Sequence, residues 1–195
     1  MDPVGEAVNE VRAGNLIVIP TDTVYGIGGR ADSPEVTRRL FEAKGRPRSL
    51  ELPVLVGSTA AAREVAAMDE RAERLAAAFW PGALTIVLPR APGAIGWDLG
   101  GDPGSVGVRV PDHRLALEIL RSTGPMAVTS ANRSGSPPLD NGDDLVAAFG
   151  DLVAVYLCEE RPLIGVSSTV VDMTDGLRVL REGGIPEAAL RAALA

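Results

Sequence analysis

Short apolar runs alternate with segments of helical periodicity along this chain, and the alternation predicts an α/β fold with a mixed sheet. Near the start, apolar residues spaced three or four apart predict a helix that begins at Asp2-Pro3 and ends at Gly14. The continuous apolar run over residues 16–19 predicts a strand that is buried on both faces. We expect residues 20–29 to form a loop.

The same alternation continues to the end of the chain. Ser33-Pro34 predicts a helix that continues to Ala43, and Ser58 is placed to cap the helices that follow it. Strands are predicted at residues 52–56, 84–88, 106–110, 126–129, 153–157, 169–173 and 177–180, and further helices near residues 112–121 and 186–194. The irregular segments 90–105 and 134–144 are predicted to be loops beside a site.

The composition is typical of a soluble globular protein, and we expect residues 1–195 to form a single domain. Of the 195 residues, 46% are hydrophobic and 23% are charged, so the chain can bury a core and is not disordered. Its apolar runs are shorter than the ~18 residues that cross a bilayer, which argues against a membrane protein. The first ten residues do not resemble a secretory signal, so we expect a cytoplasmic location.

Cysteine and histidine are too scarce for several kinds of site. The chain has one cysteine, Cys158, and one histidine, His113, which excludes an internal disulfide and a zinc site built from cysteine and histidine. They also leave few ways to build a thiol or serine triad. Only carboxylates remain as ligands for a metal.

One lysine stands among 18 arginines, and it lies in a cationic segment. Lys44, Arg46 and Arg48 fall within five positions, where Gly45 and Pro47 prevent a helix from continuing. We therefore expect Lys44 to lie in an exposed loop, to contact a phosphate ligand and to contribute little to stability. The alternative is that an arginine-rich composition has retained one lysine by chance.

Five clusters of hydroxyl, amide and cationic groups coincide with predicted strand ends. They comprise residues 21–25, 44–48, 105–109, 129–132 and 167–169, with Arg181 downstream. Each alone is typical of a cap or turn, but together they favour a site for phosphate and carboxylate groups. Arg109 and Arg181 lie in apolar strand patterns, so each needs a ligand or a structural partner such as Asp112 or Glu182.

Two nucleotide-binding motifs can be set aside. Residues 26–31 match G-x-G-x-x-A, but the segment PTDTVY separates them from the strand and the helix begins only at Ser33. The chain also has no G-x-x-x-x-G-K-[ST] motif, so the phosphates of a bound nucleotide must be held in another way.

An ordered set of motifs resembles the YrdC/Sua5 family of threonylcarbamoyl-AMP synthases between about residues 14 and 184. The motifs are PTDTVYG, FEAKGRPRSLELPVLV, WPGALTIVL, VGVRVPDH, TSANRSG, SSTVVDM and LRVLREGG. The resemblance implies a YrdC-like twisted mixed sheet with flanking helices and a concave cationic cavity. It also implies that ATP, L-threonine and bicarbonate or CO2 yield threonylcarbamoyl-AMP and pyrophosphate, with Mg2+ accompanying ATP. A transferase partner would then modify tRNA.

The resemblance assigns roles to individual residues. It places Thr23, Arg109, Thr129, Ser130 and Ser168 around threonine, and Lys44, Arg46, Ser105, Asn132 and Arg181 along ATP. Lys44 and Arg46 fall at the phosphates as the catalytic pair, and no metal ligand is assigned. Leu50-Glu51 and Leu55 depart from the Asn-Pro or Lys-Pro and the histidine of many relatives. The chain matches the branch of the family without a further C-terminal domain.

The implied chemistry agrees with the residues. Attack of a carbamate oxygen on the α-phosphate needs positioning, charge neutralisation and exclusion of water, but no protein nucleophile. A different interpretation is an RNA-binding module for tRNA or double-stranded RNA, against which a net charge of −7 and seven aromatic residues argue weakly. A third is another ATP-dependent carbamoyl-transfer enzyme.

Overall fold

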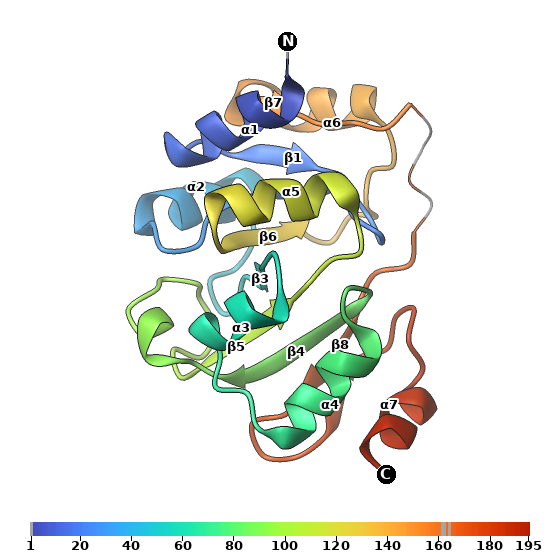
Figure 1. Ribbon diagram of the computed structural model, residues 1–195. Helices are drawn as coiled ribbons and strands as arrows, with labels where there is room; N and C mark the ends of the chain where they lie inside the picture. The colour runs from blue at the N-terminus through green and yellow to red at the C-terminus, as the bar shows by residue number, and fades with distance from the viewer. Residues whose placement is uncertain (1, 161–162, 164) are drawn as a thin grey trace.

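The computed structural model describes residues 2–160, 163 and 165–195, and a mixed β-sheet runs through the middle of this part of the chain (Figure 1). The strands are β1 (Ile17–Ile19), β2 (Gly26–Arg30), β3 (Val54–Leu55), β4 (Leu84–Pro89), β5 (Ser105–Arg109), β6 (Met126–Ser130), β7 (Val155–Tyr156), β8 (Thr169–Asp172) and β9 (Arg178–Arg181). Within the described residues they form one sheet in the order β7-β1-β2-β6-β3-β5-β4-β8-β9. The pairs β1–β7, β3–β5 and β4–β8 are parallel and the others antiparallel, which confirms the predicted mixed α/β fold.

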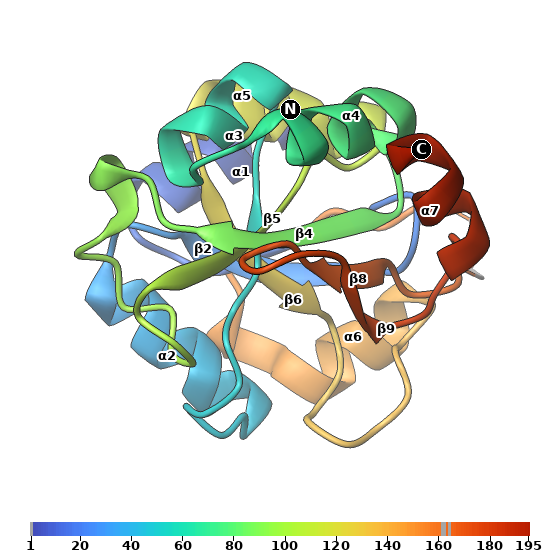
Figure 2. The ribbon, with the colours of Figure 1, turned by 90° about the horizontal axis from the view of Figure 1, so that it is seen from below.

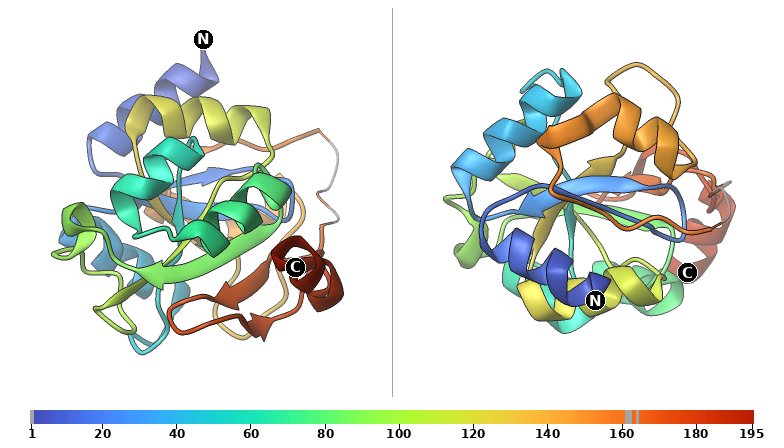
Figure 3. Two further views of the ribbon diagram at one scale, coloured as in Figure 1. Left: turned by 60° about the horizontal axis from the view of Figure 1, so that its bottom comes forward. Right: turned by 90° about the horizontal axis from the view of Figure 1, so that it is seen from above.

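Helices cover both faces of this sheet. They are α1 (Pro3–Arg12), α2 (Pro34–Lys44), α3 (Thr59–Val65), α4 (Glu70–Phe79), α5 (Arg114–Thr123), α6 (Gly142–Phe149) and α7 (Glu187–Leu194), with short 3-10 helices η1 (Pro92–Ala94) and η2 (Gly150–Leu152). The helices α1, α3, α4 and α5 lie on one side of the twisted sheet and α2 and α6 on the other (Figures 2 and 3), and α7 packs beside α4. No helix among the described residues is both long enough and apolar enough to span a membrane.

Alternating side chains divide the interior into two apolar clusters. In β1, Ile17 and Ile19 belong to the cluster that contains the apolar residues of α1 and α5, whereas Val18 belongs to the cluster that contains those of α2. Ile86 of β4 and Val108 of β5 belong to this second cluster, together with apolar residues of α3 and α4. The residues between them in β4 and β5 therefore point to the opposite face of the sheet.

The helix starts agree with the predicted caps. The side chains of Asp2, Ser33 and Ser58 each accept a backbone N–H from the first turn of α1, α2 and α3. The helix α5 begins at Arg114, two residues after the predicted start, and β3 and β7 are shorter than the apolar runs from which they were predicted.

The prediction of a loop over residues 20–29 is wrong in its second half. Residues 26–30 form β2, which pairs antiparallel with both β1 and β6, although glycine is a poor strand former. The close approach of β2 and β6 explains why β2 is rich in glycine, since a Cβ atom on Gly28 would lie 2.2 Å from the carbonyl oxygen of Ala127. Because these glycines lie within a strand and not at a strand-to-helix turn, the dinucleotide motif remains set aside.

The prediction of a continuous loop over residues 134–144 is also wrong, because α6 begins at Gly142. The Asn141 side chain caps this helix by accepting the backbone N–H of Asp144 at 3.0 Å. Glycine and aspartate at the start of the helix are typical of loops, so the sequence pattern concealed it.

Replacement of Gly28 by alanine is expected to lower the free energy of unfolding by about 1–3 kcal/mol, because the added methyl group meets backbone atoms of β6 that cannot move independently. Chemical denaturation measures the change. Gly96→Ala is the matched control, since a Cβ atom at Gly96 meets nothing within 4 Å and should change stability by less than about 0.5 kcal/mol. Equal stability of the two variants would contradict the steric explanation of β2.

Candidate active site

A pocket of about 300 Å³ lies on the face of β3, β5, β4 and β8 that is opposite the core-facing residues Ile86 of β4 and Val108 of β5. Thr85 and Val87 of β4 and Gly107 and Arg109 of β5 form its floor, and they alternate with the residues that enter the core. Loop residues 21–25, the residues Arg46 and Glu51 before β3, and Ser167 and Ser168 before β8 form its walls. Each strand of this half of the sheet thus contributes one face to the core and the other to the pocket.

Arg109 is the most constrained cation of the pocket. Only 6% of the residue is exposed, and its guanidinium donates to Asp22 Oδ1 at 2.6 Å, Thr23 Oγ1 at 3.0 Å and the carbonyl of Gly82 at 2.9 Å. Burial lowers the pKa of Arg109, and the adjacent Asp22 carboxylate opposes this effect. The charge is therefore held in place by two other segments of the chain, residues 22–23 and Gly82.

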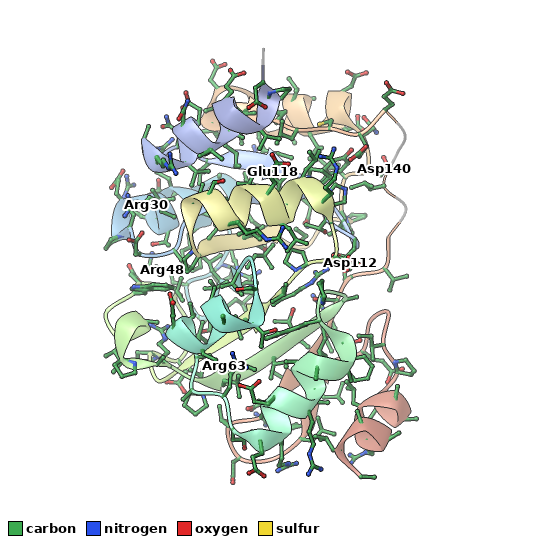
Figure 4. The ribbon with its side chains drawn as sticks, in the orientation of Figure 1. Arg30, Arg48, Arg63, Asp112, Glu118 and Asp140 are labelled. Atoms are coloured by element: carbon green, nitrogen blue, oxygen red, sulfur yellow. The ribbon has the colours of Figure 1, made fainter. Side chains whose placement is uncertain are left out.

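Asp22, and not Asp112, is the structural partner of Arg109. Asp112 contributes only its backbone N–H, which donates to the same Asp22 oxygen at 3.0 Å, and its position beside α5 is labelled in Figure 4. The suggested pairing of Arg109 with Asp112 is therefore wrong. The sequence does show an acidic residue, Asp22, within the TDT motif. Nothing in the sequence links it to Arg109, which lies far along the chain.

The loop that carries Thr23 is held in one conformation by short-range hydrogen bonds. Thr21 Oγ1 accepts the backbone N–H groups of Thr23 and Val24, both at 3.2 Å. The buried Tyr25 hydroxyl accepts the N–H of Glu159 at 2.8 Å, and a Cβ atom on Gly165 would overlap the Thr23 carbonyl oxygen. Gly165 therefore packs directly against the backbone of Thr23, where only a residue without a side chain fits.

Lys44 does not lie in an exposed loop, so that prediction is wrong. It is the last residue of α2 and is 2% exposed. Its Nζ atom donates to the carbonyl oxygens of Ser130, at 2.5 Å, and Asn132, at 2.6 Å, and lies 3.4 Å from Asn132 Oδ1. Burial lowers the pKa of Lys44 to about 8, with the charge of Arg46 adding to the effect. Lys44 therefore holds the end of β6 in place from behind the pocket wall.

Arg46 and Arg181 are the two pocket arginines without a carboxylate partner among the described residues. Arg46 donates to the carbonyls of Leu50 and Glu51, and Arg181 donates to the carbonyl and hydroxyl of Ser168. Burial lowers the pKa of both, and the charge of Arg181 lowers that of Arg46 further. The suggested pairing of Arg181 with Glu182 is absent from the described contacts, and both cations are available to an anion.

Most of the residues assigned from the sequence meet in this one pocket. Those that line it are Thr23, Arg46, Arg109, Thr129, Ser130, Ser168 and Arg181. Lys44, Ser105 and Asn132 are buried and are not among the lining residues. Ser105 is a buried residue whose carbonyl accepts Arg90 Nε at 2.7 Å, and the Asn132 amide donates to the carbonyls of Arg133 and Ser136.

The sequence analysis gave no role to Glu51 and Thr85, which line the pocket, or to Asp22, which pairs with Arg109 without lining it. Thr85 Oγ1 lies 3.0 Å from Ser168 Oγ, which links the floor to the wall. Thr85 could have been noticed as the one polar residue in the apolar run of β4. Strands commonly contain threonine, however, so it did not stand out as a pocket residue. No group of three or more metal-ligating side chains occurs among the residues that the structure describes.

Comparisons with known proteins give a consistent result. The model of the Sua5, YciO and YrdC family, described as "Telomere recombination", matches residues 9–183. A protein of Mycobacterium tuberculosis is 46% identical over 181 residues, which cover 92% of this chain and 83% of that protein. The threonylcarbamoyl-AMP synthase of Pyrococcus abyssi is 38% identical over 92% of this chain and 54% of its own length.

Solved structures show the same fold. Sua5 of P. abyssi in complex with L-threonine superposes with a TM-score of 0.88 at 33% identity, over 98% of this chain and 57% of that chain. YciO of Escherichia coli gives a TM-score of 0.88 at 25% identity, over 96% of this chain and 92% of that chain. This chain therefore spans about half of the P. abyssi protein and nearly all of YciO.

Replacement of Lys44 by alanine is expected to destabilise the fold by about 2–4 kcal/mol, because two buried carbonyls lose a charged donor. Thermal and chemical unfolding measure the loss. Arg38→Ala on the exposed side of α2 is the control, since it removes only surface ion pairs with Glu35 and Glu42 and should have a much smaller effect. A Lys44→Ala protein of native stability would show that the ammonium does not support β6.

Proposed function

This chain belongs to the Sua5/YciO/YrdC family, and on that premise we propose that it is a nucleotidyltransferase that forms threonylcarbamoyl-AMP and pyrophosphate from L-threonine, bicarbonate and ATP. The observation that carries the proposal is the division of charge within the pocket. One arginine, Arg109, is fixed by Asp22, while Arg46 and Arg181 have no carboxylate partner in the described structure. A small carboxylate substrate and a polyphosphate would use these two kinds of cation differently.

We place threonine at Arg109, with its carboxylate on the guanidinium. Thr23, Thr129, Ser130 and Ser168 also line the pocket, and their hydroxyls suit the polar groups of an amino acid. The related Sua5 structure contains L-threonine, which supports this substrate. Because Asp22 already pairs with Arg109, the site presents a partly neutralised cation, which favours a singly charged carboxylate over a phosphate.

We place the ATP phosphates at Arg46 and Arg181. Both guanidiniums are partly buried without a carboxylate partner, and such charges are costly unless an anion binds. Lys44 donates to the carbonyls of Ser130 and Asn132 and adds positive charge at a distance, so we assign Lys44 and Asn132 a positioning role. Mg2+ would enter as part of the MgATP substrate, held by phosphate oxygens and water.

The chemistry then requires no nucleophile from the protein. Condensation of the threonine amine with bicarbonate forms N-carboxythreonine and water. A carbamate oxygen attacks the α-phosphorus, a new P–O bond forms, and the bond to the β-phosphate bridging oxygen breaks with release of pyrophosphate. The arginines neutralise the charge on the leaving group.

The product is an activated carbamoyl group and must be consumed by an acceptor. We propose that a threonylcarbamoyl transferase passes it to tRNA, and that both steps take place in the cytoplasm. The family resemblance supports these partners, whereas the printed names of the relatives support only the synthesis of threonylcarbamoyl-AMP.

The assay for this function is exchange of labelled pyrophosphate into ATP, with and without L-threonine and bicarbonate. We expect exchange only when both are present, and an AMP-linked product by mass spectrometry. Binding of tRNA or double-stranded RNA without exchange would favour the RNA-binding module. Exchange that depends on a different carbamoyl acceptor would favour another carbamoyl-transfer enzyme.

Replacement of Arg109 by lysine is expected to raise the KM for threonine about tenfold or more while changing the KM for ATP much less, because lysine keeps the charge but loses the paired donors. Steady-state kinetics with each substrate varied in turn test this. The control is Arg114→Lys, since the Arg114 side chain is 82% exposed and makes a helix-surface pair with Glu118. An equal rise of both constants in a folded Arg109→Lys protein would contradict the threonine assignment.

A further inference from the structure

Thr85 and Ser168 form a pair of hydroxyls in the pocket, and the function proposed above gives Thr85 no role. Their oxygens lie 3.0 Å apart, and both residues line the pocket although Thr85 is only 5% and Ser168 only 7% exposed. The pairing of β4 with β8 fixes this contact, since Thr85 is the partner of Val170, two residues after Ser168. The sheet therefore holds the two side chains next to each other.

Arg181 donates to the serine of this pair. Its Nε and Nη2 atoms donate to the Ser168 carbonyl at 3.1 and 2.9 Å, and Nη2 also donates to Ser168 Oγ at 3.2 Å. A guanidinium has only donors, so Ser168 Oγ is the acceptor in this contact. The hydrogen of the Ser168 hydroxyl is therefore still free to donate elsewhere.

A count of hydrogens shows that the pair has one donor to spare. Each hydroxyl carries one hydrogen, and the contact between the two oxygens uses one of the two. Apart from that contact and the one with Arg181, neither hydroxyl has a hydrogen bond among the described residues. Whichever hydroxyl donates to the other, one O–H group is left without a protein acceptor there. Because both residues line the pocket, a bound ligand can supply the acceptor.

The charge of Arg181 favours one direction for this chain of hydrogen bonds. A hydroxyl that accepts from a cation becomes a stronger donor, because hydrogen bonds in series polarise one another. The favoured order runs from Arg181 to Ser168 and from Ser168 to Thr85. In this order the spare O–H group belongs to Thr85, on the pocket floor.

The pairing of β4 with β5 brings Thr85 next to Arg109. Ile86 pairs with Val108, and Thr85 and Arg109 are the residues adjacent to that pair, both of them lining the pocket. Arg109 uses three of its five N–H groups on other residues and has two left for a ligand. A carboxylate accepts several hydrogen bonds through its two oxygens, so a carboxylate at Arg109 suits the spare O–H group of Thr85 as well.

We propose that Thr85 is a further substrate-binding residue, and that its hydroxyl donates to the carboxylate of L-threonine held at Arg109. Ser168 then acts through Thr85, by accepting from Arg181 and donating to the Thr85 oxygen. One chain of hydrogen bonds thus links the arginine placed at the ATP phosphates to the threonine carboxylate. This inference rests on the part of the proposed function that places threonine at Arg109.

Calorimetric titration of L-threonine into the wild type and Thr85→Val tests the inference. Valine has nearly the same shape as threonine and is a good strand former, so the variant removes the hydroxyl and keeps β4. We expect the affinity for L-threonine to fall about tenfold or more, because a hydrogen bond to a charged group is lost. The KM for ATP should change less than about twofold. Thr85→Ser keeps a hydroxyl and should restore most of the affinity.

Thr123→Val is the matched control. The Thr123 hydroxyl donates to the carbonyl of Ile119 within α5 at 3.0 Å, and Thr123 does not line the pocket. Its replacement removes a comparable hydroxyl and should leave the affinity for L-threonine and the KM for ATP unchanged. An equal fall in affinity in Thr123→Val and Thr85→Val would show a general effect on the fold and overturn the inference. So would a Thr85→Val protein with the affinity of the wild type.

Ser168→Ala tests the direction of the chain. If the spare O–H group belongs to Thr85, this variant keeps that donor and should lose less affinity for L-threonine than Thr85→Val does. The reverse order of the two variants would make Ser168 the donor to the substrate and overturn the inference.

L-2-aminobutyrate identifies the group that Thr85 binds, because it keeps the carboxylate of threonine and lacks the side-chain hydroxyl. Thr85→Val should weaken both ligands by the same factor. A loss confined to L-threonine would mean that Thr85 binds the side-chain hydroxyl, and would overturn the carboxylate assignment. A protein whose affinity for L-threonine depends on Thr85, yet which catalyses no threonine-dependent exchange, would retain this inference and refute the proposed function.

Discussion

The burial of the Arg109 guanidinium is the constraint on which the site depends. A cation in the interior of a β-sheet must find acceptors in several directions, and here they come from the loop after β1 and from Gly82 before β4. These segments are distant in sequence, and they meet because both accept hydrogen bonds from Arg109 at the end of β5. The position of Thr23, the depth of the pocket and the partial neutralisation of its floor all follow from this one residue.

The sheet supports the fold and the site with the same strands. In β4 and β5, one set of alternating residues packs with apolar residues of α3 and α4, and the other forms the pocket floor. A change on one face therefore moves the backbone that positions the other. Precision at the pocket comes from the rigidity of a packed core, with loops adding the walls.

Sequence analysis predicted the features that follow from local chemistry. An arginine in an apolar strand predicted a paired charge at Arg109, and hydroxyl clusters at strand ends predicted most of the pocket lining. It placed Lys44 wrongly, because the predicted helix ended at Ala43 and left Lys44 in an exposed loop. The helix α2 includes Lys44, and tertiary contacts with Ser130 and Asn132 bury it. Asp22 and Glu51 could not be assigned, since their partners Arg109 and Arg90 are far along the chain.

The burial of Lys44 has a consequence for the chemistry of the protein surface. It is the chain's only lysine, and in the folded state 2% of the residue is accessible. Reagents and enzymes that modify an ε-amine, by acylation or by attachment of another polypeptide, therefore find no accessible acceptor on this fold. Opening of the structure around α2 and β6 would expose that amine. The rate at which the amine is modified would therefore report the fraction of molecules that are open at this place.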